Sequence, residues 1–168
     1  ITHDHYDHMV KENIEKLRVD ETKVLGPEKV TMQVDGETIK EGEKKTIGSL
    51  TIEAVPAYNN EKPNHPKGTG VGYIISIEGK RLYHAGDTDL IPEMSNLGNI
   101  EIALLSVGNE VMDVEEAEIA CTKIKPKFIE KHNPRIGLIT LASDFRIEKD
   151  FSNVIHGEEI DLYCNRIQ

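Results

Sequence analysis

The sequence predicts a single α/β domain, and three patterns along the chain support this prediction. Residues 70–85 hold two apolar runs joined at Glu78–Gly79, which is typical of a β-hairpin. Residues 102–107 form a continuous apolar run that favours a buried strand. Residues 113–124 combine a capping-box start with helical apolar spacing. With 38% hydrophobic and 30% charged residues, the 168-residue chain fits one compact domain, so residues 1–168 are treated as one unit.

Short elements are predicted before the hairpin. Apolar residues within 10–17 recur at the i, i+4 and i+7 spacing of a short amphipathic helix. Two β-branched runs, residues 22–25 and 29–34, end at turn-forming pairs and are expected to be short strands or hairpins. Residues 48–55 alternate apolar and polar side chains, which predicts a half-buried strand that ends at Pro56.

The remaining segments connect these elements. Residues 59–70 are rich in Asn, Pro, Lys and Gly and are expected to form a surface loop. The capped helix should stop at Pro126. Residues 128–129 suggest a short strand that leads to His132, and residues 159–163 suggest a last strand.

Charge and cysteine content narrow the possible partners and the compartment. A formal net charge of −10 and a pI near 5.2 disfavour binding to nucleic acid or to an anionic membrane surface, and the sequence contains no basic patch. Cys121 and Cys164 lie in neither a CxxC nor a Cys/His ligand spacing, so a reduced, cytoplasmic setting is expected. The sequence has no apolar stretch of about 20 residues and no signal-peptide pattern, so a soluble protein is expected.

The densest chemical motif is HDHYDH at residues 3–8. In an extended segment alternate side chains point the same way, so His3 and His5 can face one ion while Asp4 faces elsewhere. Asp7 and His8 can then reach a second ion beside the first. Zinc accepts imidazole nitrogen and carboxylate oxygen, and its catalytic sites keep one position open for water. Four donors within six residues therefore predict parts of two adjacent metal sites.

This motif resembles the signature of the metallo-β-lactamase superfamily, and the resemblance extends along nearly the whole chain through AVPAYN, NHPKGTGVGY, RLYHAGDTD, VGN and DVEEA. It is closest to a branch of small, lactonase-like metal-dependent hydrolases. The resemblance implies a four-layer αββα sandwich whose first strands precede the HxHxDH motif. The domain is therefore expected to be N-terminally truncated, with a homo-oligomer or a complementing N-terminal segment as a possible partner.

The resemblance also implies the ligands and their roles. Seven residues would hold two zinc ions, with iron or manganese as alternatives: His3, His5 and His65 for the first ion, Asp7, His8 and His132 for the second, and Asp87 between the two. Asp7 and Asp87 would be the catalytic residues. The nucleophile would be a hydroxide between the metals, and a small molecule with an ester, lactone or phosphodiester-type bond would be the substrate. His84 is expected to orient the site or to pack in its strand, and His156 to be exposed.

A second hypothesis is a degenerate or truncated homologue that binds metal weakly and has no catalytic role. It rests on the missing first strands and on the surroundings of His132, which read IEKHNP where the family usually has a Pro-x-His-Tyr run. A nuclease-type RNA processing factor would need a basic groove, which the sequence does not supply. Substrate and oligomeric state cannot be read from the residues, because one fold can host many functions.

Overall fold

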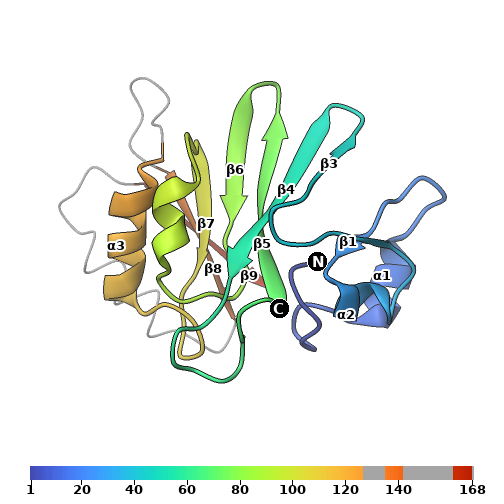
Figure 1. Ribbon diagram of the computed structural model, residues 1–168, viewed down its shortest axis with the longest axis horizontal. Helices are drawn as coiled ribbons and strands as arrows, with labels where there is room; N and C mark the ends of the chain where they lie inside the picture. The colour runs from blue at the N-terminus through green and yellow to red at the C-terminus, as the bar shows by residue number, and fades with distance from the viewer. Residues whose placement is uncertain (127–134, 142–160, 168) are drawn as a thin grey trace.

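The computed structural model describes residues 1–126, 135–141 and 161–167, the last two ranges as backbone strands (Figure 1). Its main feature is a seven-stranded mixed sheet with the strand order β3-β4-β5-β6-β7-β8-β9. The pairs from β3 to β6 are antiparallel and the pairs from β6 to β9 are parallel. The strands are β3 (Lys44–Ile47), β4 (Leu50–Ala57), β5 (Gly70–Ile77), β6 (Lys80–His84), β7 (Ile102–Ser106), β8 (Arg135–Leu141) and β9 (Asp161–Ile167).

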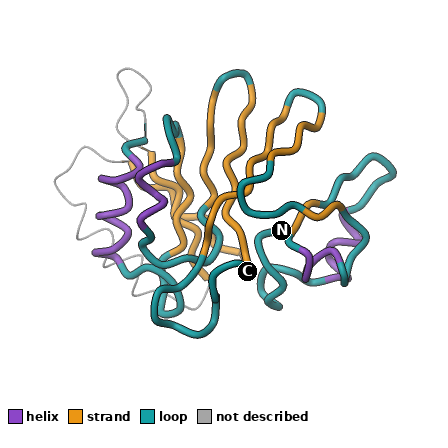
Figure 2. The backbone as a smooth tube through the Cα atoms, in the orientation of Figure 1, coloured by secondary structure: helices purple, strands orange, loops and turns teal. Residues whose placement is uncertain are grey.

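Helices lie on both sides of this sheet in the ribbon and tube views (Figures 1 and 2). On one side are α3 (Val114–Ile124) and the 3₁₀ helix η1 (Pro92–Asn96). The N-terminal region lies on the other side and consists of α1 (Lys11–Leu17), α2 (Glu28–Thr31) and a two-stranded parallel sheet of β1 (Leu25–Gly26) and β2 (Glu37–Thr38). None of the helices in the described ranges is long and apolar enough to cross a membrane.

The central sheet has two apolar faces because successive side chains of a strand point to opposite sides. On β5, Ile74 belongs to the core beneath α3 and η1, whereas Tyr73 and Ile75 belong to the cluster on the opposite face. On β4, Val55 belongs to the core beneath α3 and η1, and Ala54 belongs to the cluster on the opposite face. The sheet therefore packs against other elements on both sides, as an internal layer does.

The predicted hairpin and capped helix are confirmed, and a strand is present over most of residues 102–107. Glu78 and Gly79 both have positive φ, 50° and 77°, between β5 and β6, as a tight hairpin turn requires. In α3, Asp113 accepts a hydrogen bond from the Glu116 backbone N–H (2.8 Å), and the Glu116 carboxylate accepts one from the Asp113 N–H (3.0 Å). The strand over residues 102–107 appears as β7 and begins with an exposed Ile102, so it is buried only in part.

Two predictions from the first half of the chain are wrong. Residues 29–34 form the end of α2 and the turn after it, because Val30 and Val34, four residues apart, both face a small core that contains Met9. The strand over residues 48–55 does not end at Pro56 and continues to Ala57. A proline fits there because β3 pairs only with the first four residues of β4, so the described residues place no strand on that side of Pro56 to receive an N–H.

The other predicted elements agree to different degrees. The helix within residues 10–17 is confirmed as α1, although Leu17 is exposed and only Ile14 packs against the small core. The run 22–25 contributes only its last residue to β1. The last strand begins two residues later than expected and extends to Ile167. The predicted strand at 128–129 lies outside the described residues.

Candidate metal centre

Three loops bring most of the predicted ligands together at one end of the central strands β4, β5 and β6. Residues 3–8 form the N-terminal loop, His65 lies in the loop between β4 and β5, and Asp87 follows β6. The N-terminal segment is held beside β5 because the Val71 N–H donates to the Thr2 carbonyl (3.0 Å). Since β4, β5 and β6 are neighbours, the loops at their ends meet beside this segment.

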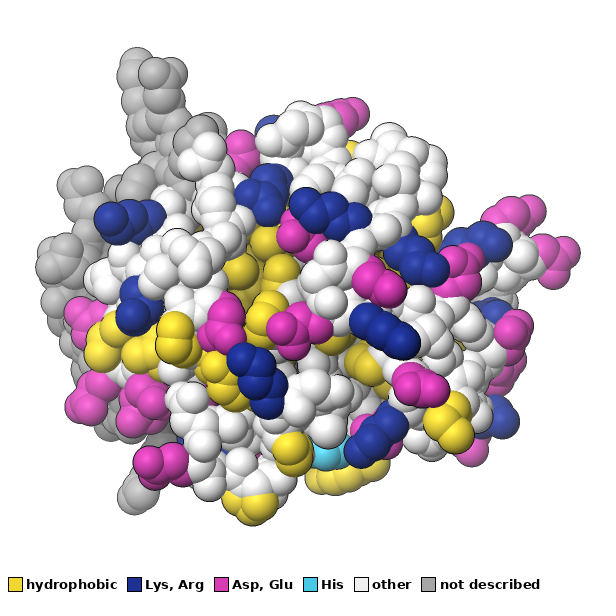
Figure 3. All heavy atoms as spheres, in the orientation of Figure 1, with side chains coloured by type: hydrophobic (Ala, Val, Ile, Leu, Met, Phe, Trp, Pro, Cys, Tyr) yellow, Lys and Arg dark blue, Asp and Glu magenta, His cyan; other side chains and the backbone are white. Residues whose placement is uncertain are grey.

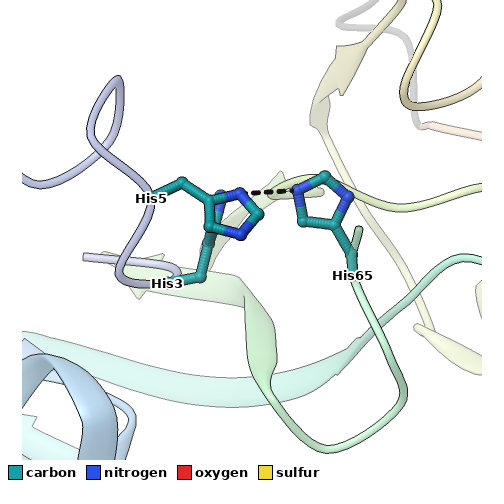
Figure 4. A group of neighbouring side chains, drawn as sticks. All are labelled: His3, His5 and His65. Atoms are coloured by element: carbon teal, nitrogen blue, oxygen red, sulfur yellow. Dashed lines mark hydrogen bonds between the residues drawn. The ribbon is translucent and has the colours of Figure 1, made fainter. Parts of the chain in front are cut away.

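His3, His5 and His65 form the first potential metal group, with ligand atoms all within 4.8 Å of one another (Figure 4). Their imidazole rings converge from two separate loops. Nε2 of His65 lies 3.1 Å from Nδ1 of His5. Two nitrogens bound to one tetrahedral zinc at about 2.0–2.1 Å lie about 3.3 Å apart. The observed spacing therefore fits two ligands of one ion.

Nε2 of His3 is a buried nitrogen for which the described residues provide no hydrogen-bond partner. The other ring nitrogen, Nδ1, lies 2.9 Å from the Thr2 hydroxyl. Burial, together with the charge of His8, lowers the pKa of His3 from 6.5 to about 4, so its imidazole is neutral near pH 7. When Nδ1–H donates to Thr2, Nε2 carries the free lone pair that a metal requires. This buried nitrogen, left without a partner by the described part of the chain, is the feature that best fits a cation.

Asp87 places one carboxylate oxygen between the two halves of the centre. Its Oδ2 lies 3.3 Å from Nε2 of His65 and 3.3 Å from Nε2 of His8. It also lies 3.8 Å from Nε2 of His3, and the ligand atoms of His3, His8 and Asp87 form a second potential metal group. His3 thus belongs to both groups. The shared oxygen has the position expected of a ligand between two ions.

The electrostatics of this cluster are those of a carboxylate among imidazoles. Burial by itself would raise the pKa of Asp87, but its contacts with His65 and His8 and the charges of His8 and His3 hold that pKa well below its usual range. Burial would likewise lower the pKa of His8, but the hydrogen bond to Asp87 and the charges of Asp87 and Asp7 raise it above its ordinary value. Asp87 is therefore ionised and available as a ligand near neutral pH.

The backbone before Asp87 is shaped by a glycine and a histidine. Gly86 has φ of +64°, and a Cβ at this position would lie 2.8 Å from the Val71 carbonyl oxygen and 3.3 Å from Thr2. Its N–H donates to Nδ1 of His84 (3.1 Å). Burial lowers the pKa of His84, which keeps this acceptor nitrogen unprotonated. His84 therefore supports the turn that delivers Asp87, in line with the expected orienting role.

The structure does not bring every predicted ligand into a group. Asp7 is exposed, and its Oδ2 lies 3.7 Å from Nε2 of His8, but Asp7 belongs to neither group. His132 and His156 lie outside the described residues. The assignment of Asp7 and His132 to a second ion therefore stays a prediction.

Sequence reasoning missed two polar residues behind the cluster, Asn59 and Asp89. Both are almost fully buried, and they hydrogen-bond to each other (2.9 Å). Both stand in segments already singled out, AVPAYN and GDTD, but a buried asparagine has no sequence pattern that separates it from a loop residue. On the face drawn in Figure 3, little histidine surface is visible, and acidic and basic side chains are interspersed.

Comparisons with known proteins agree with this architecture. A family model described as the β-lactamase superfamily domain matches residues 1–130. The chain is 36% identical over 138 residues to a metal-dependent hydrolase of Staphylothermus marinus, covering 76% of this chain and 58% of that protein. The chain spans about half the length of the curated relatives it matches.

Solved structures show the same fold. A crystal structure of a candidate metal-dependent hydrolase from Parabacteroides distasonis matches 100% of this chain and 75% of that one, with a TM-score of 0.84 and 32% identity. A metallo-β-lactamase fold protein of Bacillus subtilis matches with a TM-score of 0.67 and 12% identity, covering 99% of this chain and 73% of that one. The predicted metallo-β-lactamase fold is confirmed.

Proposed function

This chain belongs to the β-lactamase superfamily, and we propose on that basis that it carries the metal centre of a metal-dependent hydrolase. The observation that carries the proposal is the convergence of three histidines and Asp87 around the buried His3, whose Nε2 has no hydrogen-bond partner among the described residues. A histidine cluster of this kind has little structural use without a cation, because neutral imidazoles that face one another leave lone pairs without donors. The hydrolase names of the relatives support the reaction class.

The proposed cofactor is a pair of zinc ions. His3, His5 and His65 would hold one ion, Asp7, His8 and His132 would hold the other, and Asp87 would be shared between the two. Imidazole-rich sites suit zinc, while the carboxylate leaves iron or manganese as alternatives. When bound, such ions lower the pKa of water and stabilise negative charge on a substrate oxygen.

The residues of the chain have separate tasks in this proposal. Thr2 holds Nδ1 of His3, and the lowered pKa keeps that imidazole neutral and able to donate its lone pair. Asp87 stays ionised and adds negative charge between the histidines. His84 and Gly86 fix the turn that sets the position of this carboxylate.

The substrate class we propose is a small molecule with an ester, lactone or phosphodiester-type bond. The net charge of −10 disfavours long nucleic acids, because their phosphates would be repelled by the overall field of the protein. Charged groups of a small substrate can still reach a metal directly.

The test is metal content per chain, measured by elemental analysis, together with hydrolysis of generic lactone, ester and phosphodiester substrates. We expect close to two ions in the purified protein, and loss of both metal and hydrolysis in Asp87→Asn. Asp20→Asn removes an exposed carboxylate outside the cluster and serves as the matched control. About one ion without hydrolysis would instead support a degenerate homologue, and less than one ion would overturn the metal centre itself.

A further inference from the structure

Asn59 makes a complete set of hydrogen bonds directly behind His65. Its Oδ1 accepts from the His65 backbone N–H (3.1 Å) and lies 2.8 Å from Nδ1 of the same residue. Its Nδ2 donates to Oδ1 of Asp89 (2.9 Å) and to the Glu110 carbonyl (3.1 Å). Its backbone N–H donates to the His65 carbonyl (2.8 Å).

These partners fix the orientation of the Asn59 amide. A carboxylate and a carbonyl can only accept, so the amide nitrogen must face Asp89 and Glu110. A backbone N–H can only donate, so the amide oxygen must face His65. Nδ1 of His65 therefore meets an acceptor and must carry the proton. A neutral imidazole has one N–H, which leaves Nε2 as the nitrogen with the free lone pair.

Nε2 of His65 is the atom that faces the other ligands. It lies 3.1 Å from Nδ1 of His5 and 3.3 Å from Oδ2 of Asp87. The tautomer set by Asn59 is thus the one that can bind a metal within the cluster. With the opposite tautomer, Nε2 would direct a proton toward the position of the ion.

Asp89 in turn holds Asn59. Its Oδ1 also accepts from Lys62 (2.8 Å), and its Oδ2 accepts from the Asn60 backbone N–H (2.9 Å). Lys62 is further held by the Val111 carbonyl (2.6 Å). The cation and these donors compensate the carboxylate, which is 4% exposed as a residue. The GDTD segment therefore contributes two carboxylates, Asp87 among the histidines and Asp89 behind the loop of His65.

We infer that Asn59 is a positioning residue that holds His65 in the Nδ1–H tautomer with Nε2 toward the metal, and that Asp89 fixes Asn59 in that orientation. The inference rests on the proposed metal centre. Loss of a partner that orients a metal-binding histidine typically weakens metal binding about 10- to 100-fold. We expect a loss of that size when Asn59 can no longer accept from His65.

The test compares Asn59→Leu, Asn59→Asp and Asn60→Leu in the full chain. Leucine keeps the volume of Asn59 and removes the acceptor, whereas aspartate keeps an acceptor for His65 but places a second carboxylate against Asp89. Asn60 is an exposed neighbour whose side chain bonds only to the Leu90 carbonyl among the described residues, so the same exchange there is the matched control. Zinc affinity is measured by competition with a chromophoric chelator, and thermal unfolding of the metal-free protein is measured in parallel.

The tautomer is read directly from long-range ¹H–¹⁵N correlation spectra of the metal-free protein. We expect the Nδ1–H pattern for His65 in the wild type, in Asn59→Asp and in Asn60→Leu, and its loss in Asn59→Leu. Zinc affinity should fall about 10- to 100-fold in Asn59→Leu and much less in Asn59→Asp, even though Asn59→Asp loses stability. An unchanged tautomer in Asn59→Leu, or affinity losses that simply follow stability in both variants, would overturn the inference. Failure of the wild type to bind zinc would instead overturn the proposed metal centre.

Discussion

His5 and His65 are 60 positions apart in the sequence, yet Nδ1 of the first lies 3.1 Å from Nε2 of the second. The contact depends on the pairing of the N-terminal segment with the start of β5, which follows the loop of His65. Any change that alters this pairing, or the turn that carries Asp87, should therefore reduce metal binding without touching a ligand.

Gly86→Ala should destabilise the protein and weaken its metal binding. A left-handed residue other than glycine costs about 1–2 kcal/mol, and the close approach to the Val71 carbonyl should add about 1–3 kcal/mol. Gly79→Ala is the matched control, because φ is also positive there but a Cβ would meet nothing within 4 Å. Urea unfolding and zinc titration of both variants check the prediction, and equal losses of stability in the two would contradict it.

The metal-free protein should lose stability as the pH falls from 6.5 toward 4. The pKa of His3 is about 4 in the folded protein and 6.5 in the unfolded chain. The unfolded chain therefore binds more protons between these pH values. His3 contributes at most about 3 kcal/mol to the free energy of unfolding, and this contribution is fully present above pH 6.5. The lowered pKa of Asp87 continues the loss below pH 3.8, whereas the raised pKa of His8 acts in the opposite direction.

Urea unfolding of chelator-treated protein at several pH values tests this dependence. His3→Gln should flatten the dependence between pH 6.5 and 4, because the group responsible for the proton difference is gone. A slope as steep as that of the wild type would show that His3 is not its source.

Asp7→Asn should reduce the metal content from about two ions to about one if Asp7 is a ligand of the second ion. The carboxylate lies 3.7 Å from Nε2 of His8, close enough for both to reach one ion after a small movement. Asp4→Asn is the matched control, because Asp4 stands in the same loop and its side chain is expected to face away from the ions. Elemental analysis decides between the alternatives, and unchanged content in Asp7→Asn would remove this residue from the centre.

Asp113→Ala should cost about 1 kcal/mol of stability and leave metal content unchanged. The variant removes the side-chain acceptor for the Glu116 N–H and with it the capping box of α3. Glu115→Ala, in the same helical turn but outside the capping box, should cost only a few tenths of a kcal/mol. Thermal unfolding measures both, and a loss of metal in Asp113→Ala would show that α3 is coupled to the centre.

Elements whose signals lie within a few residues could be predicted from the amino-acid sequence. The hairpin at Glu78–Gly79 needs two positive φ angles, and the helix start at Asp113 needs a partner three positions later, so both are local and readable. The HDHYDH motif is readable for the same reason, since its donors are neighbours in the chain. Local patterns gave a wrong prediction where packing determines the secondary structure. Val30 and Val34 are an example, because their spacing fits both a β-branched run and a helical face.

Long-range packing, not local sequence, sets which atoms meet at the candidate metal centre. Strand order and register bring His65 and Asp87 to the N-terminal loop, and these are set by burial of both faces of the sheet over long sequence separations. The same packing excludes water from Asn59 and Asp89, so their polar atoms must bond to each other and to His65. Motif spacing could suggest candidate ligands, but the residues that orient them could be found only from the buried polar groups of the folded protein.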